Sequence, residues 1–386
     1  MITATLKLRI NALDCFLYMD KLIILNKENE VLYIDTYKFY ARYLSKYDES
    51  GLIKALFIDN KLLYNDTRVK SILNDEAKFK KLFNQISELK IGIDLNIDDL
   101  VKVENLGDLY VLDFIVYAKK FIFASKSGVY ESNLNIHNGT LEQSKKTERV
   151  HDVRAKSIIT KIGEVLVVSN YEGVFRGSLW KGYNRLTISE KPVIPNAQRI
   201  NWMKENVLSF LSDNDYNYTL YENQIEEVKE VMPGMNFEWD ESGSKSKKIK
   251  KFGIHKYSLS KLMEDINGNE QVIYAYNSNN FIFLVNESGL VRAVKLDEFI
   301  ELDKTHIITD SLDIQKVGKP LSAHMIGKAV VFEFFEQIVV LQNGILETIE
   351  ETDVYQIKGF NNSKNYQNIL AYVSEGYVNI TTVNPI

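Results

Sequence analysis

The sequence has little of what disulfide chemistry and membrane insertion require. Its 386 residues include one cysteine, Cys15, which excludes an internal disulfide and any cysteine-rich metal site. No uncharged apolar run approaches the roughly 18 residues that a membrane-spanning helix needs. The segment Met1–Arg9 lacks the long apolar stretch of a signal peptide. We therefore expect a soluble, cytoplasmic protein that does not enter a membrane.

Basic surfaces are also scarce, because the formal net charge is −5. A diffuse acidic balance argues against nucleic-acid binding, which requires a basic face. The exception is a lysine-rich run at Lys245–Lys251, which could contact nucleic acid or an acidic partner. No aromatic residues are interleaved with these lysines, so we interpret the run as part of a solvated loop.

Patterns that identify catalytic or metal centres are missing as well. The five histidines are scattered without the spacing of metal ligands: His137, His151, His255, His306 and His324. There is no Gly-x-Ser-x-Gly elbow and no glycine-rich phosphate loop. Asp213–Asn217 alternates oxygen side chains like the start of a calcium loop, but the glycine and the bidentate glutamate that complete one are absent. We predict no metal and no cofactor, and we lean against an enzyme.

What the sequence does contain is a repeated hairpin. Phe121–Tyr130 reads as an apolar strand, a polar turn ending in glycine and a second strand, and Leu166–Phe175 repeats this pattern. The turn residues Gly128 and Gly173 are 45 positions apart. Glycine or asparagine at such turns supplies the positive φ that tight hairpins need. Further copies lie at 22–34, 208–221, 281–291, 338–346 and 369–378.

A shorter strand-like segment precedes most hairpins, as at Val153–Ile159 and Arg199–Met203. Three or four strands per unit of about 45 residues is the period of a propeller blade. In these repeats the chain resembles the β-propeller superfamily, WD40-like in the broad sense, over nearly its whole length. No blade carries the Gly-His…Trp-Asp signature, and the single Trp-Asp pair, Trp239-Asp240, lies in the loop predicted below, so the resemblance identifies no family within the superfamily. It implies an all-β fold over residues 1–386: a single closed β-propeller of seven blades, within a range of six to eight.

The two chain ends are expected to share one blade. Thr3–Leu8 alternates like a strand, and Tyr377–Thr382 provides a final one. Pairing them would remove the exposed sheet edges that invite aggregation. A β-sandwich with a second domain, or an open solenoid, is the alternative architecture.

Two segments interrupt the repeat. Apolar residues at helical spacing in Asp75–Lys90 predict a helical insertion, with bounds 68–92. Leu52–Tyr64 before it is interpreted as an irregular extra blade or an outer strand. Low apolar content and small polar residues predict a long mobile loop over 232–252.

One positional pattern points to a binding site. Cationic residues and a histidine fall near the expected starts of innermost strands: Arg9, Arg154, Arg199, His324 and Lys358. In a propeller these positions approach a mouth of the central channel, where converging cations would bind a carboxylate, a phosphate or an acidic peptide. The alternative is coincidence, with some side chains pointing away.

These observations favour a binding function over catalysis. We predict a non-catalytic protein–protein interaction scaffold that is a subunit of a multi-protein complex, with another protein subunit as its partner. The helical insertion and the 232–252 loop are candidate docking elements. The alternative is an enzyme or a small-molecule- or sugar-binding propeller with its site at the channel mouth. A nucleic-acid binder that uses the lysine-rich loop is less favoured.

Overall fold

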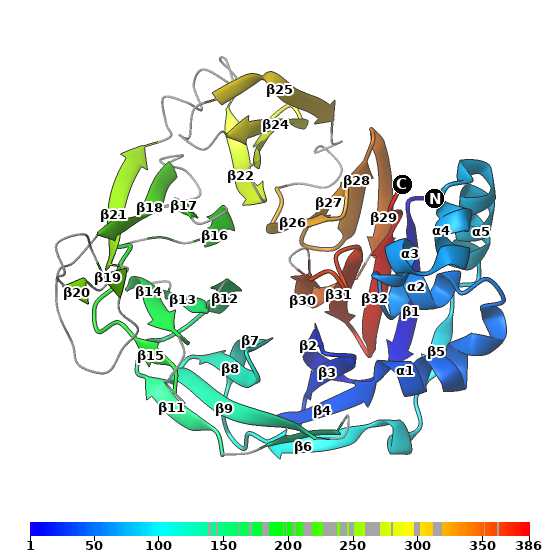
Figure 1. Cartoon of the computed structure of the whole chain (residues 1–386), viewed down its shortest axis with the longest axis horizontal. Coiled ribbons are helices and arrows are strands. Elements are labelled where there is room, and N and C mark those ends of the chain that lie inside the picture. Colours follow the sequence, from blue (N-terminus) through cyan, green and yellow to red (C-terminus); the bar gives the residue numbers. More distant parts are fainter. Residues whose placement is uncertain are drawn as a thin grey trace. The chain divides into compact units, whose positions relative to one another are not determined.

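The three-dimensional structure is a computed structural model. It describes residues 1–137, 140–143, 146–161, 163–169, 172–179, 185–195, 197, 199–203, 206–210, 218–226, 238–239, 245–246, 251–258, 271–278, 281–296, 302–311, 319–350, 352–360 and 363–386. Strands dominate these residues, and the helices are confined to one stretch near the N-terminus (Figure 1). The calcium-like turn Asp213–Asn217 lies outside the described residues, as does most of the predicted loop 232–252.

Most of the predicted hairpins form the second and third strands of sheets that contain four or five strands. In one of them β8 (Lys120–Ser125) pairs with β9 (Gly128–His137), and in the next β13 (Glu164–Ser169) pairs with β14 (Gly173–Ser178). All six residues of β8 and of β13 are buried. Gly128 and Gly173 have φ values of 143° and 99°, which glycine adopts without the steric cost that a side chain imposes. Turn chemistry and strand burial therefore agree with the predicted pattern.

Among the described residues, seven sheets contain four or five strands. In pairing order, the first three sheets consist of β2 (Ala12–Tyr18), β3 (Lys21–Asn26), β4 (Glu30–Asp35) and β6 (Val101–Asn105); of β7 (Val111–Tyr117), β8, β9 and β10 (Thr140–Gln143), with β11 (Glu148–His151) also on β9; and of β12 (Ser157–Lys161), β13, β14 and β15 (Thr187–Ile188). The next two consist of β16 (Arg199–Met203), β17 (Asn206–Phe210), β18 (Tyr218–Glu226) and β21 (Lys251–Ser258), and of β22 (Val272–Ser278), β23 (Phe281–Asn286), β24 (Leu290–Leu296) and β25 (Leu302–Ser311). The last two consist of β26 (Ser322–Ile326), β27 (Ala329–Glu333), β28 (Ile338–Gln342) and β29 (Ile345–Glu350), and of β30 (Val354–Gly359), β31 (Ile369–Ser374), β32 (Tyr377–Val383), β1 (Thr3–Arg9) and β5 (Gly92–Asp94). A further two-stranded sheet pairs β19 (Glu238–Trp239) with β20 (Lys245–Ser246). Successive up-and-down sheets of this kind are propeller blades, so the predicted all-β propeller fold is confirmed.

One predicted hairpin has a different place in its sheet. The copy at 338–346 is the pair β28–β29, which are the third and fourth strands of their sheet. The equivalent of the other hairpins is the pair β27–β28, joined by a turn through Phe334 and Phe335 that contains no glycine. In this sheet the glycine therefore marks the turn between the third and fourth strands instead of the turn between the second and third.

The closing sheet joins both ends of the chain, as predicted. β1 pairs antiparallel with β32, and Leu6 lies opposite Ile380. β5 then adds to β1 in parallel, with the Lys7 amide donating to the Ile91 carbonyl at 2.9 Å. The last three residues of the N-terminal strand, Lys7 to Arg9, are thus enclosed between two other strands.

The helical insertion is confirmed, but it begins earlier than predicted. Its helices are α1 (Thr36–Phe39), α2 (Leu52–Phe57), α3 (Leu62–Asn65), α4 (Thr67–Leu73) and α5 (Glu76–Glu88), with short turns η1 (Tyr40–Leu44), η2 (Ser45–Tyr47) and η3 (Ile97–Asp99). The interpretation of Leu52–Tyr64 as a blade or strand is wrong. The Asp48 carboxylate accepts from the amides of Ile53 and Lys54 at 3.0 and 2.9 Å, which satisfies donors that the first turn of α2 leaves free.

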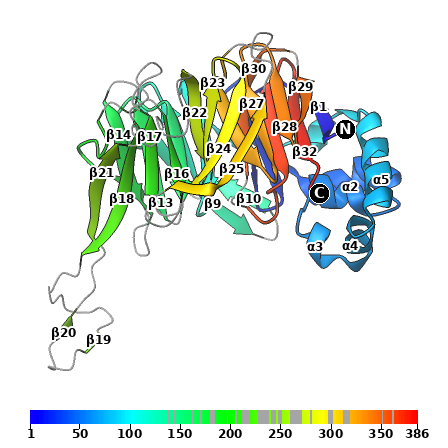
Figure 2. The same ribbon diagram turned by 90° about the horizontal axis from the view of Figure 1, so that it is seen from above.

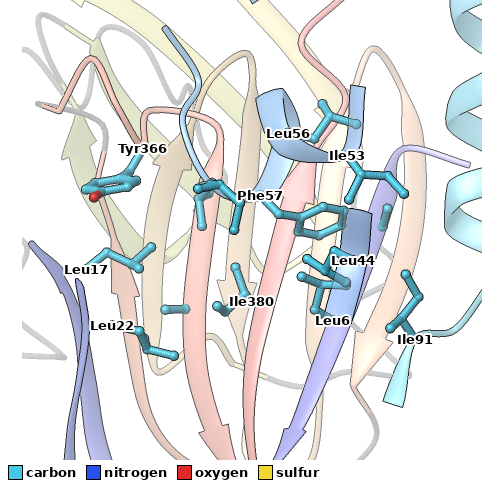
Figure 3. Close-up of a cluster of buried hydrophobic side chains, with 14 of the residues drawn as sticks. Leu6, Leu17, Leu22, Leu44, Ile53, Leu56, Phe57, Ile91, Tyr366 and Ile380 are labelled. Carbon is cyan, nitrogen blue, oxygen red and sulfur yellow. The ribbon is translucent and has the colours of Figure 1, made fainter. Parts of the chain in front are cut away.

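The insertion packs against the closing sheet. Figure 2 shows α2 to α5 beside β1 and β32. Phe57, Phe79 and Phe83 are almost completely buried in one core cluster. Figure 3 shows Phe57 in this cluster beside Leu6 and Ile380. Each such aromatic contributes about 1.5–3 kcal/mol by burial. The helices are therefore part of the folded core and not a loosely attached arm.

By their internal contacts the residues form two compact units. Unit 1 comprises 1–163, 179–187 and 310–386, and unit 2 comprises 164–178 and 188–309. Unit 1 contains the helices and the four sheets whose first strands are β2, β7, β26 and β30. Unit 2 contains the sheets that begin with β16 and β22. No helix in the described ranges is long and apolar enough to cross a bilayer.

Candidate interaction surface

The first strands of unit 1 are joined to one another by repeated side-chain contacts. Asp14 in β2 and Asp113 in β7 occupy equivalent positions, each directly after a register shift in the pairing with the second strand. The Phe114 amide donates to Asp14 Oδ2 at 3.4 Å, and the Ile158 amide donates to Asp113 Oδ2 at 2.8 Å. Each aspartate thus ties its strand to the backbone of the next first strand.

A tyrosine four residues further on repeats this arrangement. The Tyr18 hydroxyl accepts from the Lys119 amide at 3.1 Å, and the Tyr117 hydroxyl accepts from the Gly163 amide at 2.7 Å. Because equivalent residues meet along β2, β7 and β12, these strands run in the same direction. Their starts therefore lie at one end of unit 1, which we call the loop end.

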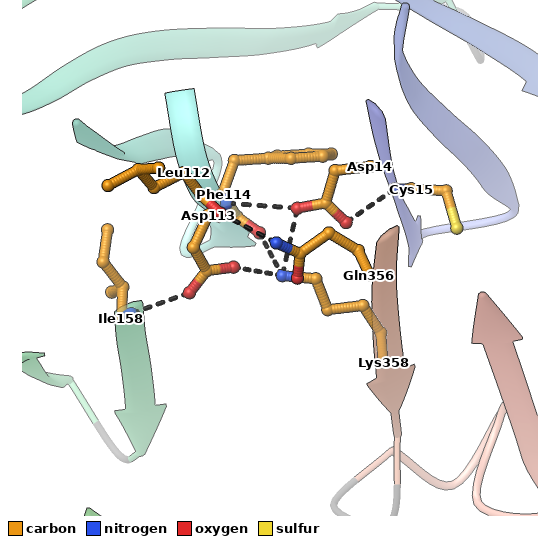
Figure 4. Close-up of polar contacts among 8 residues, drawn as sticks. All are labelled: Asp14, Cys15, Leu112, Asp113, Phe114, Ile158, Gln356 and Lys358. Carbon is orange, nitrogen blue, oxygen red and sulfur yellow. Dashed lines mark hydrogen bonds and ion pairs between the residues drawn. The ribbon is translucent and has the colours of Figure 1, made fainter. Parts of the chain in front are cut away.

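A buried lysine completes the connection (Figure 4). Lys358 Nζ in β30 lies 3.2 Å from Asp14 Oδ2, contacts Asp113 Oδ1 and donates to the Phe114 carbonyl at 3.1 Å. Gln356 Nε2 donates to the Leu112 carbonyl at 2.8 Å. We call Asp14, Asp113, Gln356 and Lys358 the inner-strand network.

Burial and charge shift the ionisation of this network. Burial raises the pKa of Asp14 to about 7, although Lys358 opposes the shift. Burial alone would lower the pKa of Lys358, but Asp113 and Asp14 raise it above its usual range, so the lysine stays protonated. The neighbouring Cys15 thiol is buried and its pKa is raised, which keeps it in the unreactive thiol form. These groups hold strands together instead of facing a ligand.

His324 in β26 is next to this network and is uncharged at neutral pH. Its Nε2 lies 3.2 Å from Ser322 Oγ. Burial lowers the pKa of His324 to about 4, and the nearby charge of Lys358 acts in the same direction. His324 is therefore neutral, and Lys358 is paired with two carboxylates. Anion binding by these two residues at a channel mouth stays a prediction.

The other three predicted site residues lie in separate segments of the two units. Arg9 is the last residue of β1, where it pairs with Tyr377, and β1 is the fourth strand of its sheet. The prediction that Arg9 begins an innermost strand is therefore wrong. Arg154 is exposed between β11 and β12. Arg199 begins β16 in unit 2, where its guanidinium lies 4.4 Å from the Tyr274 ring centroid. Anion binding at a channel mouth by Arg154 and Arg199 stays a prediction.

The loop end of unit 1 exposes large apolar side chains. They are Leu321 (54% exposed), Phe335 (74%), Tyr110 (59%) and Tyr355 (44%), which we call the loop-end residues. Leu321, Tyr110 and Tyr355 lie at the starts of first strands, and Phe335 lies in a turn between a second and a third strand. The start of a first strand and this turn are at the same end of a sheet, because Ser322 pairs with Glu333 and Val111 pairs with Ser125. β26 and β30 also end together, because the Gly327 amide donates to the Gln367 carbonyl at 3.0 Å, so their starts share the loop end.

Two of these rings are covered by lysines. Lys126 Nζ lies 4.3 Å from the centroid of Tyr110, and Lys27 Nζ lies 5.4 Å from that of Tyr355. Cation–π contacts at exposed sites contribute about 0.5–1 kcal/mol and restrict the ring. Single exposed apolar residues are ordinary, but aromatic side chains gathered at one end are typical of protein interfaces.

The sequence contained a signal for the network but none for the exposed aromatics. Asp14–Tyr18 and Asp113–Tyr117 both read Asp-x-x-x-Tyr, a repetition that identifies equivalent strands. In contrast, Phe334 is buried at 2% exposure and Phe335 beside it is 74% exposed. The turn geometry alone separates these two phenylalanines. No group of three or more His, Cys, Asp or Glu within the described ranges could hold a metal ion.

The comparisons with known proteins show similarity in the path of the backbone but little in sequence. No protein-family model matches the chain, and a search of curated proteins found no match. Among solved structures, the β-propeller domain of Cps50 (Swd1) from Myceliophteria thermophila is 8% identical with a TM-score of 0.49 and covers 99% of this chain and 100% of its own. YCF48 bound to D1 peptide is 7% identical, TM-score 0.49, with 99% and 97% covered. The WD40 β-propeller domain of Doa1 is 10% identical, TM-score 0.47, with 99% and 96% covered.

Proposed function

We propose that this protein is a non-catalytic protein–protein interaction scaffold, a subunit of a multi-protein complex, that binds its partner at the loop end of unit 1. The observation that carries the proposal is the exposure of Tyr110, Phe335 and Tyr355 at one end of rigid sheets. Tyrosine and phenylalanine provide large contact areas with few rotatable bonds, and aromatic residues are enriched at interfaces.

The support beneath this surface is stiff. The inner-strand network and the Tyr18 and Tyr117 hydroxyls connect four sheets, those that begin with β30, β2, β7 and β12, through backbone amides and carbonyls. A surface held in one geometry loses little conformational entropy when it binds. The stiffness of this surface supports the proposal that a partner binds there.

The enzyme alternative would use groups with shifted ionisation, of which Asp14 is the leading one. Both carboxylate oxygens of Asp14 are engaged: Oδ1 by the Cys15 amide at 2.7 Å, and Oδ2 by the Phe114 amide and Lys358. Asp113 is engaged in the same way by Ile158 and Lys358. Carboxylates with every oxygen occupied by protein donors favour a structural role.

The test is affinity capture from the native host followed by quantitative mass spectrometry. The wild-type chain is expected to retain one stoichiometric partner, and the variant Tyr110→Ser/Phe335→Ser/Tyr355→Ser is expected to lose it. The matched control Met19→Ser/Tyr47→Ser/Ile97→Ser removes three similarly exposed side chains away from the loop end and is expected to retain it. Recovery of the wild-type chain alone, or equal capture by the loop-end variant, would contradict the proposal.

We also propose that the protein resides in the cytoplasm. A single buried thiol and no disulfide-forming pair of cysteines support a reducing compartment. Fractionation of host cells tests this, and recovery mainly from a membrane or secreted fraction would contradict it.

A further inference from the structure

Five exposed basic side chains cluster at the loop end of unit 1, around the starts of β9 and β12. This basic patch consists of Lys126, Arg149, Arg154, Lys156 and Arg185. Lys126 is the lysine above Tyr110, so the patch is continuous with the loop-end residues. Its charge departs from the chain as a whole, whose net charge is −5.

Local backbone geometry points the basic side chains outward. Between β11 and β12 the side chains of Val153 and Ala155 are buried, at 3% and 1% exposure. Arg154 and Lys156, which alternate with these buried residues along the chain, are exposed and project into solvent. The Ala155 amide donates to the Ser125 carbonyl at 3.1 Å, which fixes this alternation against the sheet.

The surrounding backbone is also fixed. A Cβ at Gly128 would lie 2.4 Å from the His151 carbonyl oxygen, so glycine lets β9 approach this segment closely. Arg185 Nη2 donates to the Arg149 carbonyl at 2.7 Å, and the Leu186 amide donates to Glu131 Oε2 at 2.9 Å. The basic patch is therefore built on ordered chain from three separate segments.

The charges in the patch are not equally satisfied. Arg149 Nη2 lies 3.2 Å from Asp152 Oδ1, which neutralises one cation internally. Arg154 and Lys156 have no carboxylate partner among the residues that the structure describes. Two neighbouring cations on one face without a counter-charge are complementary to a carboxylate-bearing ligand.

We propose that the basic patch binds an acidic segment of the partner in extended conformation, with carboxylates at alternate positions pairing with Arg154 and Lys156. This inference rests on the proposed function and names the chemistry of the partner. Alternate residues of an extended ligand lie on one face, so acidic side chains at its positions i and i+2 can pair with two cations that are also two positions apart in their chain, Arg154 and Lys156. An apolar side chain of the same segment would contact Tyr110.

A nucleic acid is a less suitable occupant. A long polyanion meets the repulsion of the whole chain, which carries a net charge of −5, whereas a short peptide meets mainly the local patch. Nucleic-acid binding is therefore an outcome that the experiment must separate from the proposal.

The experiment is fluorescence polarisation with three labelled peptides of equal length. In the first, glutamate alternates with threonine; in the second, the same residues are arranged in two blocks; in the third, glutamine replaces every glutamate. We expect the alternating peptide to bind most tightly, the block peptide more weakly and the glutamine peptide not measurably. Affinity for the alternating peptide should fall with added salt.

Two charge-reversal variants locate the site. Arg154→Glu/Lys156→Glu should weaken binding of the alternating peptide by about tenfold or more, because two attractive pairs become repulsive. Lys78→Glu/Lys81→Glu makes the same change of net charge on exposed positions of α5 and should leave affinity unchanged. If the reversal variant fails to fold by circular dichroism, Arg154→Gln/Lys156→Gln replaces it with a smaller expected loss.

Several results would overturn the inference. They are absence of binding to the alternating peptide at low salt, equal binding of the alternating and block peptides, equal loss in the α5 control, or tighter binding of a single-stranded oligonucleotide. If any of these occurs while the loop-end serine variant still loses the captured partner, the inference fails and the proposed function stands. If the peptide binds as expected but host capture yields no partner, the proposed function fails instead.

Discussion

The inner-strand network and the basic patch use the same kinds of side chain in opposite ways. Lys358 is 12% exposed and is held by two carboxylates, whereas Arg154 and Lys156 are exposed and have no acidic partner among the described residues. A buried charge is costly unless it is paired, so the network must be complete for the sheets to hold. An exposed charge costs little and stays free for a ligand. Burial, rather than residue type, thus separates the inner-strand network from the proposed binding patch in unit 1.

The largest effect is expected from Lys358→Met. The substitution leaves Asp14 and Asp113 buried without their cation, which should lower the free energy of unfolding by about 3–5 kcal/mol. Urea denaturation measures this loss. Lys156→Met is the matched control in the basic patch and should change stability by less than about 0.5 kcal/mol. Similar losses in both variants would remove the distinction between the two regions.

The second effect is a pH dependence that comes from His324. Its pKa is about 4 in the folded chain and 6.5 as the ordinary value, so acidification through this range protonates the unfolded chain first. As the pH falls from 6.5 toward 4, the free energy of unfolding of the wild type should therefore decrease relative to that of His324→Gln, by at most about 3 kcal/mol. Urea denaturation at several pH values measures it, and a pH-independent difference would contradict burial of a neutral ring.

A smaller effect is expected when one link between sheets is removed. Tyr117→Phe deletes the hydroxyl that accepts from the Gly163 amide and should cost about 1 kcal/mol of stability. Tyr110→Phe deletes a hydroxyl at the loop end and should have no measurable effect on stability. Thermal denaturation compares the two variants. An equal loss in both would show that the repeated tyrosine does not connect the sheets.

The smallest effect is expected at Arg9. Its guanidinium lies 3.6 Å from Asp94, and both side chains are largely exposed, so Arg9→Ala should change stability by no more than about 0.5 kcal/mol. The same variant should bind the alternating peptide as the wild type does, because Arg9 is outside the basic patch. A clear loss of peptide binding would show that Arg9 contributes to the binding site and would contradict this prediction.

The sequence predicted local structure well and long-range chemistry poorly. Turn glycines and alternating strands identified the hairpins and the shared blade, and helical spacing identified α5. The carboxylates around Lys358 could not be inferred, because Asp14 and Asp113 are hundreds of positions away in the sequence and meet it only through the arrangement of sheets. Arg9 was wrongly predicted to begin an innermost strand, because the innermost strand β2 begins only two residues after β1 ends at Arg9.

The central claim is that the exposed loop end binds a partner while the buried network only supports it. Its most direct test is the amount of partner that equal quantities of wild-type chain and of the Tyr110→Ser/Phe335→Ser/Tyr355→Ser variant capture from the native host. We predict a stoichiometric partner on the wild type and near-complete loss on the variant, at unchanged thermal stability. Equal amounts of partner on both chains would contradict this account.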